Sequence, residues 1–317
     1  MDFRMCIEKG HTILMEGALG ERLKREYGIL FDEHVAMAGL VYEKKGALAL
    51  SALWNEYIEI ARKYQLPFIA TTPTRRANRE RISLSRYSEN IIADNVSFLK
   101  NIQMNCGSEM YVGGLMGCKG DAYTGEGALL EKEATDFHKW TVEQFCDANV
   151  NFLYAGIMPV LSEAAGLAKA IDVTGLPYII SFTIQQDGKL IDGTPIADAI
   201  QYIDDITCNR PVCYMANCVH PTIVYKALSR DFNNVTIVKE RFKGIQANTS
   251  PLSYAELDSA VDLHCSEPKG FAEDMMRLSQ VGNFQIWGGC CGTDNRHMEC
   301  IAQELNTLKK IQKQYKA

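Results

Sequence analysis

The chain repeats one pattern eight times over its 317 residues: a short apolar run followed by a longer amphipathic stretch. The strand-like runs are Thr12–Met15, Pro67–Thr71, Met110–Gly114, Asn151–Ala155, Tyr178–Thr183, Val212–Met215, Gly244–Ala247 and Phe284–Trp287. The helical patterns are Ala47–Tyr64, Ser88–Met104, Lys132–Ala148, Leu161–Val173, Pro195–Ile206, Pro221–Arg230, Pro268–Val281 and Asp294–Tyr315. Such alternation predicts right-handed βαβ units and a parallel sheet, because each helix must return the chain to the same edge.

Eight units favour a closed (β/α)8 barrel, the TIM barrel of the α/β class, over an open sheet. The main alternative is a doubly wound sheet, which opens with a G-x-G-x-x-G turn. The turn after the first strand, Gly17-Ala18-Leu19-Gly20, does not fit that motif. We therefore expect one barrel domain over residues 1–317, with its chemistry at the carboxyl ends of the strands.

Composition narrows the class of protein further. Hydrophobic residues make up 47% of the chain and charged residues 23%, which is ordinary for a globular protein. The net charge of −6 offers no general attraction to nucleic acid or anionic lipid. The first ten residues lack the apolar stretch of a signal peptide, and the longest charge-free apolar segment, Ala148–Ser162, is too short to span a bilayer. We expect a cytoplasmic protein with no membrane or nucleic-acid partner.

Three of the eleven cysteines fall where strands end. Cys218 follows the sixth strand, and Cys290 and Cys291 follow the eighth. In a barrel these two strands are separated only by the seventh, so the three thiols are expected at one rim. Adjacent residues of a regular strand face opposite ways, so the glycines at 288, 289 and 292 are needed to turn both cysteines the same way.

Three thiolates suit Zn²⁺, and three protein ligands with an open fourth position are typical of a catalytic site. A thiol entering that position would lose its proton and stay electron-rich, which is what alkylation of sulfur requires. Spacing alone leaves three other interpretations: unrelated buried thiols, a vicinal disulfide, or a structural zinc with His220 or Cys213 as fourth ligand.

The run Gly288-Gly289-Cys290-Cys291-Gly292-Thr293, with Asn217-Cys218 upstream, resembles the homocysteine S-methyltransferase family. The acidic–Gly turn that begins at Glu16 and the segment Val112–Leu115 followed by Gly117 are also similar to that family, so the resemblance covers roughly residues 12–305. It implies a zinc-containing barrel that methylates homocysteine to methionine, with Cys218, Cys290 and Cys291 as zinc ligands and Glu16 and Gly17 against the substrate.

Two further polar residues are substrate-binding candidates because of where they lie. Thr71 ends the second strand, and Asn217 precedes a predicted ligand. The chain departs from the family at two places. Ala155 and Gly156 stand where many members carry a glutamate that binds the substrate ammonium, and Arg75, Arg76, Arg79 and Arg81 follow the second strand. The arginines are either a solvated helix face or an anion site.

The function expected is therefore transfer of a methyl group from an external donor to a zinc-bound thiol, homocysteine or a related one. The sequence does not identify the methyl donor. A separate corrinoid protein or a folate could supply the methyl group, and the sequence does not determine the oligomeric state. Two alternatives remain. One is a zinc-dependent hydrolase or lyase of a sulfur compound, with Glu16 as the base. The other is a non-catalytic, zinc-binding descendant of the family.

Overall fold

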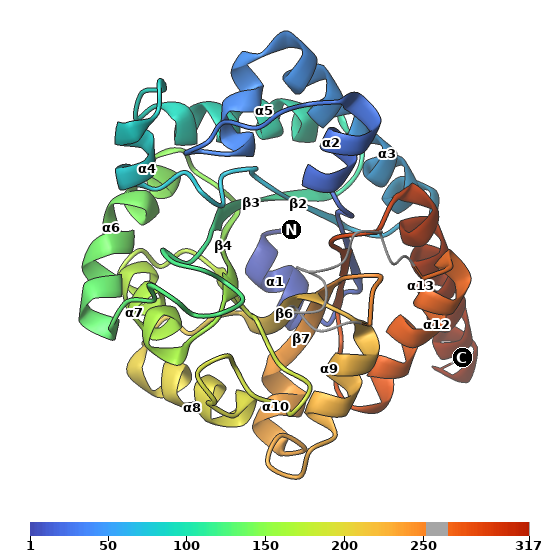
Figure 1. Ribbon diagram of the computed structural model, residues 1–317. Helices are drawn as coiled ribbons and strands as arrows, with labels where there is room; N and C mark the ends of the chain where they lie inside the picture. Colours follow the sequence, from blue (N-terminus) through green and yellow to red (C-terminus); the bar gives the residue numbers. More distant parts are fainter. Residues whose placement is uncertain (252–265, 317) are drawn as a thin grey trace.

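A computed structural model describes residues 1–251 and 266–316. Eight parallel strands close into one barrel in chain order, with β8 paired to β1. The strands are β1 (Ile13–Met15), β2 (Phe68–Thr71), β3 (Met110–Met116), β4 (Phe152–Met158), β5 (Tyr178–Phe182), β6 (Cys213–Val219), β7 (Phe242–Ala247) and β8 (Ile286–Gly289). Figure 1 looks down this barrel, with the helices arranged around it. The predicted (β/α)8 class is confirmed.

The outer helices follow the predicted stretches closely. They are α3 (Lys44–Lys63), α5 (Ile91–Asn105), α6 (Glu131–Asp147), α7 (Leu161–Asp172), α8 (Ile196–Ile206), α9 (Pro221–Leu228), α12 (Pro268–Arg277) and α13 (Asn295–Lys316). Each packs an apolar face on the barrel. Within the part of the chain that the structure describes, no helix is long and apolar enough to cross a membrane.

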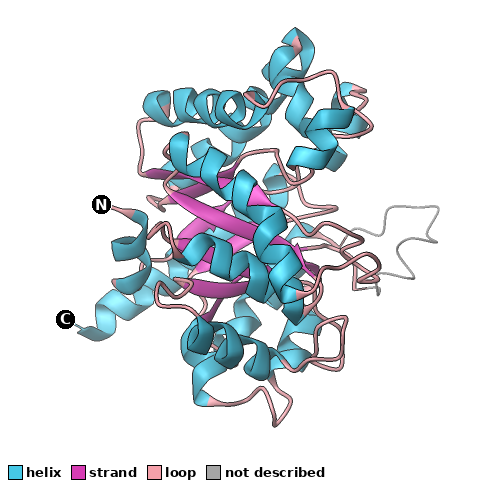
Figure 2. Ribbon diagram, turned by 90° about the vertical axis from the view of Figure 1, so that its left-hand side faces the viewer, coloured by secondary structure: helices cyan, strands magenta, loops and turns pink. Residues whose placement is uncertain are grey.

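Several short helices were not predicted. They are α1 (Phe3–Glu8), α2 (Gly20–Tyr27), α4 (Arg79–Leu84), α10 (Thr236–Arg241) and the 3₁₀ helix η1 (Met37–Tyr42), whereas the 3₁₀ helix η2 (Leu278–Gln280) falls within the predicted stretch Pro268–Val281. Helix α1 closes the amino end of the barrel, where Phe3 stacks on Phe152 at 4.1 Å and Cys6 and Ile7 join the interior cluster. Both termini lie at this end in Figure 2.

Four strands run further than the apolar runs predicted: β3 and β8 by two residues, and β4 and β6 by three and four. Strand β4 continues to Met158, so Gly156 lies inside it rather than after it. Strand β6 continues through Cys218 to Val219 rather than ending at Met215. Both extensions contain a shift in register, between Ala155 and Met158 and between Asn217 and Val219. These irregular strand ends reach the mouth of the barrel.

Two buried carboxylates tie the helical layer to the barrel. Asp204 of α8 pairs with Arg241 at 2.8 Å and accepts a hydrogen bond from the Tyr214 hydroxyl at 2.9 Å. Glu163 of α7 is fully buried, faces His138 Nε2 at 3.0 Å and accepts from two backbone amides of the loop after β3. The second carboxylate therefore fixes a loop that borders the barrel mouth.

Candidate functional site

One cavity of about 210 Å³ opens at the carboxyl end of the barrel. Its walls come from the ends of all strands except β5, and they include each residue that the sequence proposed for the site. Those residues are Glu16, Gly17, Thr71, Asn217, Cys218, Cys290 and Cys291. The fold thus brings together side chains that lie up to 275 positions apart in the sequence, and their roles stay predictions.

The thiols of β6 and β8 meet in this cavity. The sulfur atoms of Cys218 and Cys290 are 2.8 Å apart. Cys218 has a left-handed backbone, with φ of 57°, which is rare for a residue with a side chain. Asn248 at the end of β7 donates from its side-chain amide to the Cys218 carbonyl at 2.8 Å, which helps to hold that conformation. Without the register shift beside it, the Cys218 side chain would continue the regular alternation of the strand.

The segment after β8 is held from both neighbouring strands. The Cys290 amide donates to Ala247 O at 2.7 Å, and the Gly289 amide donates to Glu16 O at 3.0 Å. Gly292 has φ of 82°, and a Cβ built there would lie 1.9 Å from Thr249 Oγ1. Only glycine is compatible with that position, so the glycine predicted to turn the paired cysteines is required here.

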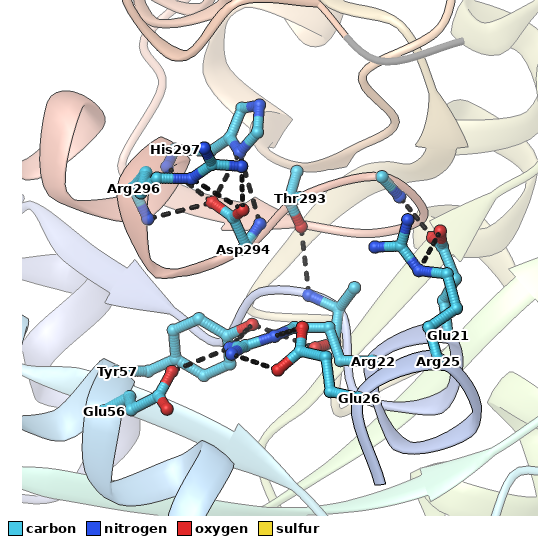
Figure 3. A network of polar contacts seen from close by, with 12 residues as sticks. Glu21, Arg22, Arg25, Glu26, Glu56, Tyr57, Thr293, Asp294, Arg296 and His297 are labelled. Atoms are coloured by element: carbon cyan, nitrogen blue, oxygen red, sulfur yellow. Dashed lines mark hydrogen bonds and ion pairs between the residues drawn. The ribbon is translucent and has the colours of Figure 1, made fainter. Parts of the chain in front are cut away.

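The site also has a second layer of polar contacts, drawn in Figure 3. Thr293 Oγ1 donates to Cys290 O at 2.6 Å and accepts from the Ala18 amide at 3.0 Å. The Tyr57 hydroxyl donates to Ala18 O at 2.9 Å and accepts from Arg22 at 3.1 Å. This chain of bonds fixes the turn after β1 relative to the cysteine segment.

The thiols influence each other's ionisation. A hydrogen bond from Cys290, followed by one from Tyr123 and the positive charge of Arg75, holds the pKa of Cys218 below its usual value against the effect of burial. Hydrogen bonds to the Cys218 and Cys291 thiols, with burial, raise the pKa of Cys290 well above its usual range. Of the two thiols, Cys218 is therefore the more acidic.

The donor set suits a thiophilic cation such as Zn²⁺. Cys218 and Cys290 face each other, whereas Cys291 is exposed at the mouth. Across residues 1–251 and 266–316, no three His, Cys, Asp or Glu side chains already stand together as a ligand set. Cys290 is also hydrogen-bonded to the Cys291 thiol, so all three thiols lie along one wall of the cavity.

Glu16 at the end of β1 is buried, with 2% of its surface exposed. Its Oε1 accepts from the Thr71 amide at 3.1 Å and the Thr71 hydroxyl at 2.6 Å, and its Oε2 accepts from Trp54 Nε1 at 2.6 Å. Burial raises the pKa of Glu16 to about 7, although these hydrogen bonds lower it. The Thr71 hydroxyl, expected against substrate, is therefore used to hold the carboxylate.

Asn217 links two strands rather than bonding a thiolate. Its Oδ1 accepts from the Ile157 amide at 3.0 Å and from the Ser181 hydroxyl at 2.7 Å. Ile157 has φ of 57°, so Asn217 supports a second strained residue at the mouth. Gly17 lies against Tyr57, where a Cβ would come within 2.7 Å of the hydroxyl. Its small size is required by packing.

Two contributors were missed from the sequence, and a third, Arg75, was predicted only as part of a cluster. Tyr123, on the loop after β3, lies at the cavity beside Cys218 and is 38% exposed. Trp54 reaches Glu16 from α3, but its place in an amphipathic helix gave no sign of this. Arg75 is part of the cavity wall, whereas Arg76 and Arg79 are exposed. The arginine cluster is therefore divided: Arg75 faces the site and its exposed neighbours face solvent.

Neither proposed fourth protein ligand reaches the thiols. Cys213 begins β6 and packs in the cluster at the amino end of the barrel, five residues before Cys218 along an extended strand. That is about 16 Å at 3.3 Å per residue. The His220 Nδ1 accepts from the Thr222 amide at 3.3 Å and caps α9. The ten cysteines of the described residues are all free thiols, so no vicinal disulfide joins Cys290 and Cys291.

Comparison with protein families gives a match over nearly the whole barrel. The profile described as homocysteine S-methyltransferase matches residues 13–305. The curated homocysteine S-methyltransferase YbgG of Bacillus subtilis (strain 168) is 24% identical over 195 residues. That match spans 60% of this chain and 58% of the relative.

Solved structures agree on the architecture. The metallated form of the homocysteine methyltransferase MmuM from Escherichia coli superimposes with a TM-score of 0.74 at 18% identity, covering 95% of this chain and 99% of that one. Its oxidised form gives a TM-score of 0.73 at 19% identity, covering 92% and 96%. At these identities the likeness establishes the fold.

Proposed function

The chain belongs to the homocysteine S-methyltransferase family, and from that premise we propose that it is a zinc-dependent S-methyltransferase whose acceptor is homocysteine or a related thiol. The observation that supports this most directly is the contact of 2.8 Å between the sulfur atoms of Cys218 and Cys290, with Cys291 in the same cavity. Thiols from two strands meet at the end of the barrel where this fold carries its chemistry.

The proposal assigns Cys218, Cys290 and Cys291 as the protein ligands of Zn²⁺. When bound, the ion would hold the acceptor thiol as a nucleophilic thiolate near neutral pH. The strained backbone at Cys218 and the turn at Gly292 direct the cysteine side chains into the cavity. Cavity-lining side chains such as Leu115 and Ile157 restrict access of water, which favours attack by sulfur over hydrolysis of the donor.

Glu16 and Tyr123 complete the polar part of the proposed site. Glu16 is fixed by Thr71 and Trp54 and would lie against the substrate as part of the cavity wall. The Tyr123 hydroxyl hydrogen-bonds to Cys218 and lies where the cavity opens. Catalysis would then rest on a preformed sulfur nucleophile and on holding the donor methyl group in line with it.

The test is substitution of Cys290 by Ala, with Cys208→Ala as a matched control. Cys208 is an exposed thiol in the loop between α8 and β6, away from the cavity. Metal content is measured by mass spectrometry, and the methylated thiol is quantified with sulfonium, quaternary ammonium and methylfolate donors. We expect Cys290→Ala to lose zinc and methyl transfer and Cys208→Ala to keep both. Unaltered zinc and turnover in Cys290→Ala would remove the proposal.

A second candidate function is hydrolysis or elimination of a sulfur compound. The observation that favours it is the raised pKa of Glu16, about 7, which is the range of an effective general base. It ranks lower because three hydrogen bonds already hold that carboxylate. Sulfide as product, in place of a methylated thiol, would identify this chemistry.

The remaining assignments extend the same proposal. A folate or a separate corrinoid protein is the donor class to test first after small cations. The free thiols of the described residues fit a reducing compartment, and we place the protein in the cytoplasm on that ground. Residues 1–317 are taken as one domain, which limited proteolysis of the full chain would examine.

A further inference from the structure

We infer that the acceptor thiol is recognised through an anionic group bound by Arg75, and that an ammonium group on the acceptor contributes little. This inference rests on the proposed function and specifies its substrate class: thiols that carry a carboxylate, with or without an α-amino group. Homocysteine is one member, and its analogue lacking the amine is another.

Charge in the cavity supports the inference. Its lining includes three charged side chains, Glu16, Glu21 and Arg75. Both acids have partners: Glu16 accepts three hydrogen bonds, and Glu21 accepts from the Gly292 amide at 2.5 Å through Oε2, while its Oε1 accepts no hydrogen bond and lies 3.3 Å from Arg25 Nε. An incoming ammonium group would therefore have to share a carboxylate that is already occupied.

Arg75, in contrast to the two acids, has no partner for its charge. No hydrogen bond or ion pair joins its side chain to any other residue that the structure describes. Asp121, on the loop after β3, accepts through Oδ1 from the amides of Tyr123 and Thr124, each at 2.8 Å, and makes no ion pair with Arg75. A half-buried guanidinium with its donors unused is suited to a carboxylate, which it can bind through two parallel bonds.

The residue directly after β3, Gly117, leaves room for the Arg75 side chain. A Cβ on Gly117 would lie 2.8 Å from Arg75 Cγ and 3.0 Å from its carbonyl oxygen. Glycine at this position therefore leaves the space through which the arginine reaches the cavity. The next arginine, Arg76, is exposed and does not line the cavity.

The part of the cavity wall that β4 forms also supports the inference, because it carries no acidic side chain. Strand β4 ends in Ile157 and Met158, and Tyr154 from this strand donates to Gln246 Oε1 at 3.4 Å. Gln246 also lines the cavity, and its side chain is a neutral amide. Among the charged side chains of the described cavity wall, Arg75 is thus the one that neither a hydrogen bond nor an ion pair holds.

The experiment measures binding to the zinc-loaded protein by calorimetry with two truncated acceptors. 4-Mercaptobutanoate is homocysteine without its amine, and 3-aminopropanethiol is homocysteine without its carboxylate. We expect 4-mercaptobutanoate to bind within about 3-fold of homocysteine and 3-aminopropanethiol to bind about 10- to 150-fold more weakly, the range for loss of a charge-assisted bond. Arg75→Gln should weaken 4-mercaptobutanoate by the same factor and leave 3-aminopropanethiol unchanged.

Arg76→Gln is the matched control and should retain the wild-type preference. The inference is overturned if wild-type protein binds 3-aminopropanethiol as tightly as 4-mercaptobutanoate, or if the carboxylate preference survives in Arg75→Gln. A parallel arm uses metal-free protein with pentanoate and butylamine, which have the same shapes without sulfur. An Arg75-dependent preference for pentanoate, with no zinc bound and no thiol methylated, would reject the proposed function and keep the anion site.

Discussion

Replacing Glu16 by Gln should change how the stability of the protein depends on pH. Burial raises the pKa of Glu16 from 4.5 to about 7. Because the folded state binds this proton more tightly than the unfolded state, the stabilisation is complete below about pH 4.5 and is lost as the pH rises through 7. The shift in the Glu16 pKa corresponds to about 3 kcal/mol of the free energy of unfolding, at 1.36 kcal/mol per pKa unit.

The two proteins should therefore follow different curves. Between pH 5 and 8.5 the free energy of unfolding of the wild type falls by about 2.5 kcal/mol because Glu16 ionises. The variant has no carboxylate at this position, so its free energy of unfolding should not show this fall. At pH 5 the variant should be the less stable by about 1–3 kcal/mol, because a glutamine cannot accept from both Thr71 and Trp54 in the same way. At pH 8.5 that deficit should largely disappear.

The assay is urea unfolding at several pH values with a metal chelator present in every sample. Glu33→Gln removes an exposed carboxylate and serves as the control for net charge. Its free energy of unfolding should run parallel to that of the wild type. Parallel curves for Glu16→Gln as well, within about 0.5 kcal/mol, would show that Glu16 titrates as an ordinary glutamate and would refute the reasoning.

Three further predictions concern the frame of the site. Gly292→Ala should lower Tm and reduce zinc content, since its Cβ would meet Thr249 and its backbone is left-handed, whereas Gly270→Ala, in open space within α12, should leave Tm unchanged or slightly higher. Asp204→Asn should cost about 3 kcal/mol in urea unfolding, because it leaves a partly buried arginine unpaired; a loss under 1 kcal/mol would contradict this. Glu163→Ala should speed hydrogen exchange at residues 119–129, since two amides there lose their acceptor, and unchanged exchange would show that the loop is held otherwise.

The barrel could be predicted because its strands are buried on both faces. Runs such as Tyr178–Phe182 are almost wholly apolar, and the turns after them are marked by polar residues or glycine. The short helix α1 escaped prediction because six residues are too few for a periodic pattern. The ends of β4 and β6 were misplaced for a different reason: polar Asn217 looks like a strand end, yet its side chain is satisfied inside the barrel.

Some residues of the candidate site could likewise be predicted from the sequence, and others could not. The thiols could be located because cysteines beside glycines after the eighth strand form a local pattern. Arg75 could not be separated from Arg76, since both follow β2 and only the three-dimensional path shows which one enters the cavity. Tyr123 lies on a loop whose position depends on the buried Glu163 of α7, some 40 residues later. Long-range placement of this kind leaves no local signal.

The distribution of strain at the mouth suggests why the two irregular strand ends occur together. Ile157 on β4 and Cys218 on β6 both have φ of 57°, and such conformations cost about 1–3 kcal/mol each. Asn217 stabilises one directly through the Ile157 amide and precedes the other in sequence. The Asn217 side chain therefore supports the first departure from regular strand geometry, and the Asn248 side chain supports the second through its bond to the Cys218 carbonyl. A barrel selected for stability alone would have no need of either, and the one at Cys218 places a thiol 2.8 Å from Cys290. The strained backbone at Cys218 therefore lowers the stability of the protein at the position where the proposed chemistry needs a sulfur atom.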